Sequence, residues 1–174
     1  SGGFYVEFVA KQGENHYLNA FRRLAGRYLQ VYSSAPIKIN YIGLRETIYP
    51  VKKAPITFKS ERRQKIYDTA VKTLHCCMHE HYEDCPWREQ GLYAYDSRNQ
   101  MLYGYYVWGN YDFAQASLDL LGRGMLANGY LSLTAPGVCS VTIPSFSFMW
   151  IQEILDFVIF SGRKEFFATQ EKVV

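Results

Sequence analysis

The chain is organised around the stretch Glu83-Asp84-Cys85-Pro86-Trp87-Arg88-Glu89-Gln90-Gly91-Leu92-Tyr93-Ala94-Tyr95-Asp96. These fourteen residues include four carboxylates, one guanidinium and three aromatic rings. Pro86 and Gly91 interrupt any regular element, and longer segments with periodic apolar residues flank the stretch on both sides. A loop between two helical segments is therefore predicted, and loops held by rigid elements often carry binding or catalytic groups.

The combination of carboxylates and aromatic rings in this loop favours chemistry on a sugar. Aromatic rings stack on the apolar faces of sugars, while carboxyl groups transfer protons. The spacing of Asp84-Cys85-Pro86, Arg88-Glu89 and Asp96 also resembles the signature loop of the α-L-rhamnosidases of glycoside hydrolase family 78. That signature reads Asp-Cys-Pro-x-Arg-Glu, with a further Asp seven residues after the Glu. Gln90 to Tyr93 depart from the Leu-Gly-Trp that the family usually carries after the Glu.

The resemblance implies a role for each of the matching residues. It implies that Glu89 is the general acid of an inverting glycosidase and that Asp84 and Asp96 bind sugar hydroxyls. It also implies that the general base, a Glu, lies later in the parent protein, beyond Val174. No cofactor is expected.

The other residues of the loop are expected to support these roles. Trp87, Tyr93 and Tyr95 can supply an apolar wall that raises the pKa of Glu89 and keeps its carboxyl protonated. The planar fork of Arg88 is expected to hold Asp84 or a sugar hydroxyl. The predicted catalytic residue is thus Glu89, and the predicted substrate-binding residues are Asp84, Arg88, Asp96, Trp87 and Tyr93.

Purely structural roles remain open for the same side chains. Glu89 could be a surface carboxylate, and Trp87 could be ordinary packing. Asp84 could organise a turn through its side chain. Asp96 could cap a helix, alone or in addition to binding a sugar.

The sequence pattern before about position 58 predicts β structure. Short runs rich in aromatic and β-branched residues predict strands over 4–9, 27–32, 37–44 and 45–51, with alternating exposure in the third of these. Turns are predicted near Gly13 and Pro36.

The period changes to that of a helix at Ser60. Ser60 is a predicted N-cap for a helix over 61–79, and further helices are predicted over 98–108, from Asp112 to Met125 and over 145–160. Asp112 with Gln115 resembles a capping box, and Gly162 is a stop signal. The fold class is therefore α+β, and the rhamnosidase resemblance implies the last strands of a β-sandwich (residues 1–58) followed by the first helices of an (α/α)6 toroid (residues 59–174). The chain is expected to be a fragment that shows no turnover alone.

Two other functions stay open. One is non-catalytic carbohydrate binding, and the other is a zinc site, because zinc-type ligands cluster at His75, His79, His81 and Cys85. The net charge of +3 is dispersed, so nucleic acid is not expected as a partner. No run of apolar residues approaches the length of a membrane span. The expected partner is a rhamnose-containing glycan or glycoside, with self-association through uncovered helix faces; periplasmic, extracellular and cytoplasmic locations in a bacterium are all compatible.

Overall fold

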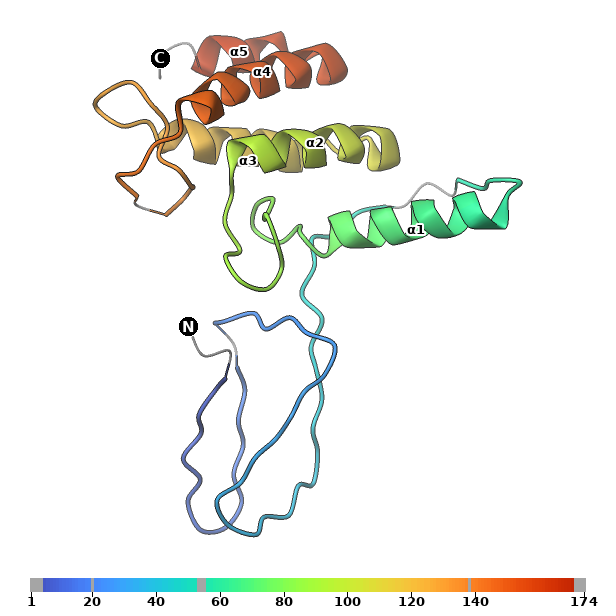
Figure 1. Ribbon diagram of the computed structural model, residues 1–174, viewed down its shortest axis with the longest axis vertical. Helices are drawn as coiled ribbons and strands as arrows, with labels where there is room; N and C mark the ends of the chain where they lie inside the picture. Colours follow the sequence, from blue (N-terminus) through green and yellow to red (C-terminus); the bar gives the residue numbers. More distant parts are fainter. Residues whose placement is uncertain (1–4, 20, 53–55, 138, 171–174) are drawn as a thin grey trace.

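The computed structural model describes residues 5–19, 21–52, 56–137 and 139–170, and it is helical from residue 61 onward (Figure 1). The helices found in these residues are α1 (Glu61–His75), α2 (Ala94–Trp108), α3 (Asp112–Arg123), α4 (Pro144–Ser161) and α5 (Lys164–Gln170). The helical part of the predicted fold is thus confirmed.

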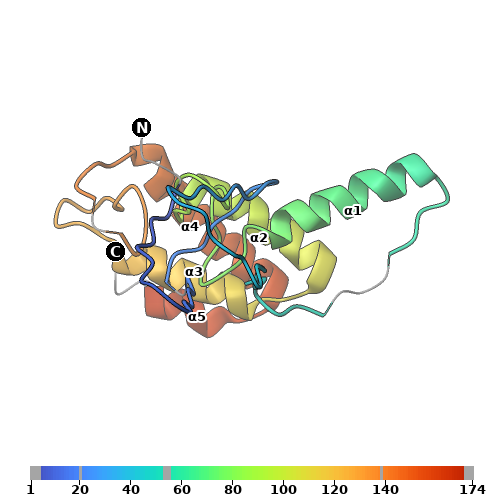
Figure 2. The ribbon, with the colours of Figure 1, turned by 90° about the horizontal axis from the view of Figure 1, so that it is seen from below.

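Four of the helices form a packed group, and α1 projects from it. α2 lies against α4, α3 packs on both, and α5 covers α4. The C-terminal end of α1 lies near α2, and the rest of α1 points away from the other helices in both views (Figures 1 and 2). Trp150 of α4 anchors the group, because its buried indole nitrogen donates a hydrogen bond to the carbonyl oxygen of Leu118 at 3.1 Å.

α1 begins where the sequence predicts but ends four residues early. The Ser60 hydroxyl accepts a hydrogen bond from the backbone N–H of Arg63 at 3.4 Å, which confirms the N-cap. The helix ends at His75 rather than His79, because the backbone groups after His75 do not continue the hydrogen bonds of the α-helix. The N–H of Glu83 donates to the carbonyl oxygen of Cys77 at 2.9 Å, so the chain reverses tightly before the carboxylate-rich loop.

α2 and α3 begin differently from the prediction. α2 starts at Ala94 instead of Arg98, so Asp96 lies in its first turn, where the helix dipole favours a negative charge. α3 starts at Asp112 as predicted, but the capping box is wrong. The side chain of Asn110 accepts hydrogen bonds from the N–H groups of Asp112 (3.1 Å) and Phe113 (3.3 Å) instead.

The end of α4 is confirmed and a fifth helix was not predicted. Pro144 occupies the first turn of α4, one residue before the expected start, and Gly162 ends the helix with a left-handed φ of 73°. α5 follows after one further residue and covers α4 through the buried ring of Phe166, whose centroid lies 5.0 Å from that of Phe157.

The expected strands are not observed. The described parts of the segments over 4–9, 27–32, 37–44 and 45–51 are extended and largely exposed, and no strand is assigned anywhere in the described chain; Phe4 lies outside the described residues. A strand needs a hydrogen-bonded neighbour and a layer that covers its apolar face. The described residues before α1 supply neither, so local alternation produces extended chain only.

Tyr49 is a point where this extended chain docks on the helices. The N–H of Tyr49 donates to the carbonyl oxygen of Met78 at 2.9 Å, and Nε2 of His75 lies 2.8 Å from the carbonyl oxygen of Tyr49. Its ring packs on Phe113, with centroids 4.4 Å apart. No helix within the described ranges has the length and apolar character needed to cross a bilayer.

A buried carboxyl lies between α2 and α4. Oε1 of Glu153 lies 2.6 Å from Oγ of Ser97, which in turn lies 3.2 Å from the carbonyl oxygen of Ala94. A serine hydroxyl has a single hydrogen, so a protonated Glu153 satisfies both contacts by donating to Ser97, which donates to Ala94. Burial agrees with this, because it raises the pKa of Glu153 well above its ordinary value.

Glu153→Gln is therefore expected to keep the fold, since an amide can donate in place of the neutral carboxyl. Because the pKa of Glu153 is raised in the folded state, its contribution to stability is full below about pH 4.5 and is lost as the pH rises. The free energy of unfolding, measured by denaturant titration from about pH 5 to about pH 9, should fall more steeply in the wild type than in Glu153→Gln. Glu153→Ala should cost about 2–4 kcal/mol. Glu165→Gln, an exposed control, should match the wild type. Equal pH slopes for the wild type, Glu153→Gln and Glu165→Gln would contradict a neutral Glu153.

Candidate functional site

The carboxylate-rich loop is closed on itself by Asp84. The N–H of Asp84 donates to the carbonyl oxygen of Gly91 at 2.9 Å, and Oδ1 of Asp84 accepts from the N–H of Gly91 at 2.9 Å. Asp84 thus organises the turn, as its structural reading predicts, and one of its two carboxylate oxygens is left for other contacts.

Glu89 lies at the open side of this loop. Its Oε2 accepts a hydrogen bond from the hydroxyl of Tyr93 at 2.8 Å, and its Oε1 pairs with Nη2 of Arg88. Its side chain remains 36% exposed. A ligand can therefore reach the carboxyl group from solvent.

The surroundings of Glu89 act against the expected rise in its pKa. The hydrogen bond from Tyr93 and then the pairing with Arg88 lower the pKa of Glu89 below its ordinary value. Tyr93 approaches through its hydroxyl rather than as an apolar wall, and Arg88 contacts Glu89 rather than Asp84. In this structure Glu89 is a carboxylate at neutral pH.

Asp96 brings a third carboxyl to the same place. Partial burial, followed by the charges of Asp84 and Glu89, raises the pKa of Asp96 above its ordinary value. The hydrogen bond to Glu89, with burial and the same neighbouring charges, raises the pKa of Tyr93 to about 12. The structure therefore gathers Asp84, Glu89, Tyr93 and Asp96 into one site at the start of α2.

Aromatic rings border this site unevenly. The ring of Phe146, at the start of α4, lies 6.3 Å from that of Tyr93 and 6.1 Å from that of Tyr95. The ring of Trp87 lies against the backbone of Gly26, because a β-carbon added to Gly26 would stand 2.7 Å from its Cζ3. Trp87 thus packs on the chain before α1. Phe146 is more than fifty residues from the loop in sequence, and no local pattern pointed to it.

Glu83, to which the sequence pattern gave no role, is fully buried beneath the loop. Oε1 pairs with Nη2 of Arg23, and Oε2 lies 3.0 Å from Nδ1 of His79. Burial raises the pKa of Glu83 to about 7, although the charge of Arg23 lowers it. The only signal for this contact was a pair of complementary charges sixty residues apart.

The proposed zinc ligands comprise three histidines and one cysteine, namely His75, His79, His81 and Cys85. A ring nitrogen of each histidine is engaged in another contact. Nε2 of His75 lies 2.8 Å from a carbonyl oxygen, Nδ1 of His79 faces Glu83, and Nδ1 of His81 lies 2.8 Å from the carbonyl oxygen of the next residue. Across the part of the chain that the structure describes, no three His, Cys, Asp or Glu side chains are grouped to hold a metal ion.

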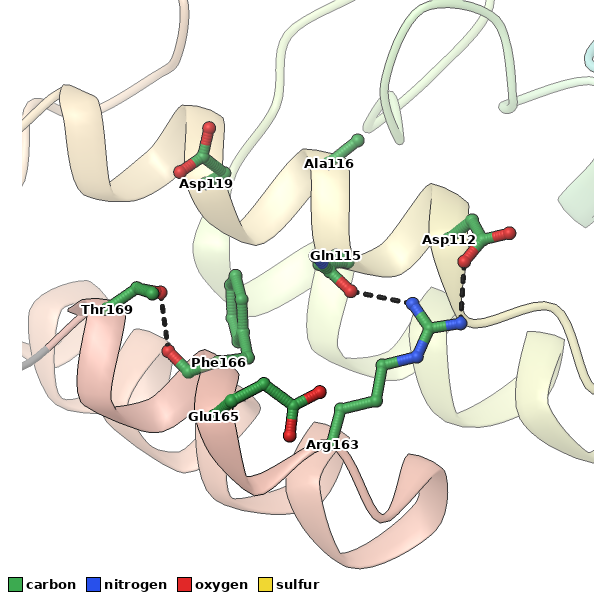
Figure 3. Close-up of a pocket in the computed structure, with 8 residues that line it drawn as sticks. All are labelled: Asp112, Gln115, Ala116, Asp119, Arg163, Glu165, Phe166 and Thr169. Carbon is green, nitrogen blue, oxygen red and sulfur yellow. Dashed lines mark hydrogen bonds and ion pairs between the residues drawn. The ribbon is translucent and has the colours of Figure 1, made fainter.

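A hollow lies between α3 and α5, distant in sequence from the loop (Figure 3). It has a volume of about 490 Å³ and is lined by Asp112, Gln115, Ala116, Asp119, Arg163, Glu165, Phe166 and Thr169. Arg163 closes one end, with Nη1 donating to Gln115 Oε1 at 2.6 Å and Nη2 2.7 Å from Asp112 Oδ1. Its polar groups are thus largely paired with one another, and it contains no residue of the carboxylate site.

Comparison with known proteins gives a consistent result. The model of the bacterial α-L-rhamnosidase six-hairpin glycosidase domain matches residues 53–159. The structure is similar to the GH78 family rhamnosidase of Bacillus sp. GL1, with a TM-score of 0.66, 25% identity and coverage of 72% of this chain and 13% of that one. It is also similar to a rhamnosidase from Klebsiella oxytoca with rhamnose bound, with a TM-score of 0.59, 20% identity and coverage of 66% and 23%. The chain thus spans less than a quarter of either protein, and no curated protein matches it.

The contacts of Glu89 predict how its pKa responds to substitution. Tyr93→Phe and Arg88→Gln should each raise the pKa of Glu89 toward its ordinary value, because each removes a group that stabilises the carboxylate. The change can be followed by NMR titration of the protein with ¹³C-labelled glutamate carboxyls. Arg62→Gln removes the same charge from an exposed site on α1 and should leave the Glu89 midpoint unchanged. An unmoved midpoint in Tyr93→Phe would show that the hydrogen bond does not form in solution.

Proposed function

Because this chain belongs to the bacterial α-L-rhamnosidase six-hairpin glycosidase family, we propose that it is the part of a glycoside hydrolase that supplies the general acid, Glu89. The proposed reaction is inverting hydrolysis of terminal α-L-rhamnosides. The observation that carries the proposal is the gathering of Asp84, Glu89 and Asp96 at an accessible site at the start of α2. The similar Klebsiella oxytoca rhamnosidase was solved with rhamnose bound, which supports the sugar.

Each side chain has a separate task in this reaction. Glu89 gives a proton to the leaving oxygen, while the oxygen of Asp84 that is not bonded to Gly91 and the carboxyl of Asp96 accept hydrogen bonds from sugar hydroxyls. An inverting enzyme also needs a general base about 6.5–9.5 Å from the acid, with room for a water between them. We place that base beyond Val174.

The lowered pKa of Glu89 sets a requirement on substrate binding. A general acid must hold its proton, so both the hydrogen bond from Tyr93 and the pairing with Arg88, which lower the pKa of Glu89, have to be given up or outweighed when the sugar arrives. Arg88 is well placed to leave the carboxyl group, because its side chain is 72% exposed and is held at Glu89 by a surface ion pair, a weak interaction. In the bound state its fork binds a sugar hydroxyl, and the sugar excludes water from Glu89. The pKa of Glu89 then rises, because desolvation opposes the ionised form.

The domain assignment follows the same proposal. Residues 1–58 are assigned to the end of a β-sandwich whose other strands lie elsewhere in the parent protein, and residues 59–174 to the first part of an (α/α)6 toroid. A stripe of exposed apolar side chains on α4 supports an incomplete toroid: Phe148, Ile151, Leu155 and Ile159. The helical hairpins that complete the toroid would cover this stripe.

In the full-length enzyme, Glu89→Gln should lower kcat by about 10²–10⁴-fold and change KM little. The loss should be smaller for a nitrophenyl rhamnoside than for a rhamnosyl disaccharide, because a nitrophenolate leaves without a proton. Asp84→Asn should raise KM and lower kcat together. Steady-state kinetics on both substrates test the roles; equal losses on both would show that Glu89 is not the acid.

The 174-residue chain alone should hydrolyse no rhamnoside, because the general base and most of the toroid are absent. It should also self-associate through the α4 stripe, since exposed apolar patches of this kind drive association. Light scattering should report oligomers, and Ile151→Glu with Leu155→Glu should shift them toward monomer. Enzyme-like turnover by the chain alone would contradict the assignment of the base, and a monomeric wild type would contradict the exposed stripe.

A further inference from the structure

We propose that Arg23 is a positioning residue for the acid loop. Its guanidinium holds the start of the loop at Glu83, and its backbone carbonyl holds the end of the loop at Gln90. This inference rests on the function proposed above, but its geometric basis does not. Arg23 lies outside the residues that the family model matches, 53–159, so the inference assigns a role to a part of the chain that the family match does not cover.

The guanidinium contact is made in a buried setting. Glu83 is completely shielded from solvent, and the Arg23 side chain is three-quarters buried, with a relative exposure of 25%. Nη2 of Arg23 pairs with Glu83 and Nη1 pairs with Glu80, so one fork spans two carboxylates of the same reversal. A buried carboxylate depends strongly on such a partner, because an unpaired buried charge is costly.

The backbone contact lies at the other end of the loop. Nε2 of Gln90 donates to the carbonyl oxygen of Arg23 at 3.5 Å and to that of Pro86 at 3.0 Å. Gln90 has a φ of 54°, in the left-handed region that non-glycine residues rarely adopt. Its side-chain contacts therefore help to hold a strained backbone directly after Glu89, and that backbone determines where the Glu89 carboxyl points.

Two further contacts complete this clamp, by which we mean the set of contacts that holds residues 83–90 in place. The backbone of Gly26 lies against the Trp87 ring, so the segment 23–26 follows the loop from Glu83 to Gln90. On the other side, Nε2 of Gln100 on α2 donates to the carbonyl oxygen of Glu83 at 2.7 Å. The loop that carries Asp84 and Glu89 is thus held between α2 and a segment that contributes no group to the proposed reaction.

The test compares Arg23→Ala with Arg22→Ala, which removes the same charge from the exposed neighbouring residue. Amide hydrogen exchange of Asp84 and Gly91 reports whether the loop is closed, independently of any activity. Both amides should exchange at least ~10-fold faster in Arg23→Ala, while exchange in α4 stays unchanged. In the full-length enzyme, kcat should fall about 10–100-fold with KM within about 3-fold, because a displaced acid reduces turnover more than binding. Arg22→Ala should match the wild type in every measurement.

A double-mutant cycle then shows whether Arg23 acts through Glu83. Glu83→Gln keeps the shape of the side chain and should also speed exchange at Asp84 and Gly91, and combining it with Arg23→Ala should add little. If Arg23→Ala does not fold, Glu83→Gln tests the same contact. Unchanged exchange and kcat in these variants, or fully additive losses, would overturn the clamp. A full-length wild type that hydrolyses no rhamnoside, combined with the expected exchange results, would refute the proposed function and leave the clamp intact.

Discussion

The buried carboxylate of Glu83 is the interaction on which the geometry of the candidate site depends. Its side chain is sealed from water directly before the loop that carries Asp84 and Glu89. A charge in that position is tolerated only when every oxygen has a partner, and here Arg23 and His79 supply them. The start of the loop is therefore held by a polar contact in addition to the apolar packing of Tyr82 and Leu92, which are buried on either side of it.

The site has an inner and an outer part. In the inner part, the charges of Glu83 and Arg23 are paired and largely buried, and they fix the backbone of the loop. In the outer part, Asp84, Glu89 and Asp96 lie near solvent, where their negative charges interact with one another and with Arg88 and Tyr93. Such an arrangement combines a rigid frame with side chains that can exchange partners when a ligand binds.

Local features of the fold could be predicted, while features that depend on distant partners could not. Ser60 and Gly162 mark helix ends because capping depends on residues nearby. The start of α2 was missed because Tyr93, at its cap position, offers no capping side chain. The predicted α1 was too long because the chain reverses after His75, where the N–H of Glu83 bonds to the carbonyl oxygen of Cys77. The predicted strands are not observed for a related reason. Alternation of apolar and polar residues indicates which face of a strand would be buried, but it does not indicate whether the neighbouring strands are present.

The site shows the same division. Asp84 and Glu89 lie in one short loop and Asp96 lies in the first turn of the helix that follows it, so their closeness in sequence was enough to bring them together. Glu83 and Phe146 were missed, since their significance arises from contacts that the fold alone creates.

The sixty residues between Arg23 and Glu83 are nearly matched by the contacts between α2 and α4, which span 56 residues for Ser97 and Glu153 and 58 for Arg98 and Asp156, so the entropic cost of loop closure is similar for both. Closing α2 on α4 buries apolar side chains such as Met101 and Trp150, whereas the segment around Arg23 stays largely exposed, so the association of the helices gains more free energy. The ion pair is therefore expected to form after the helices have assembled. A newly made molecule would then pass through a stage in which its hydrophobic centre is complete while its carboxylate loop is still fluctuating, and maturation of the reactive surface would be the last event in its folding.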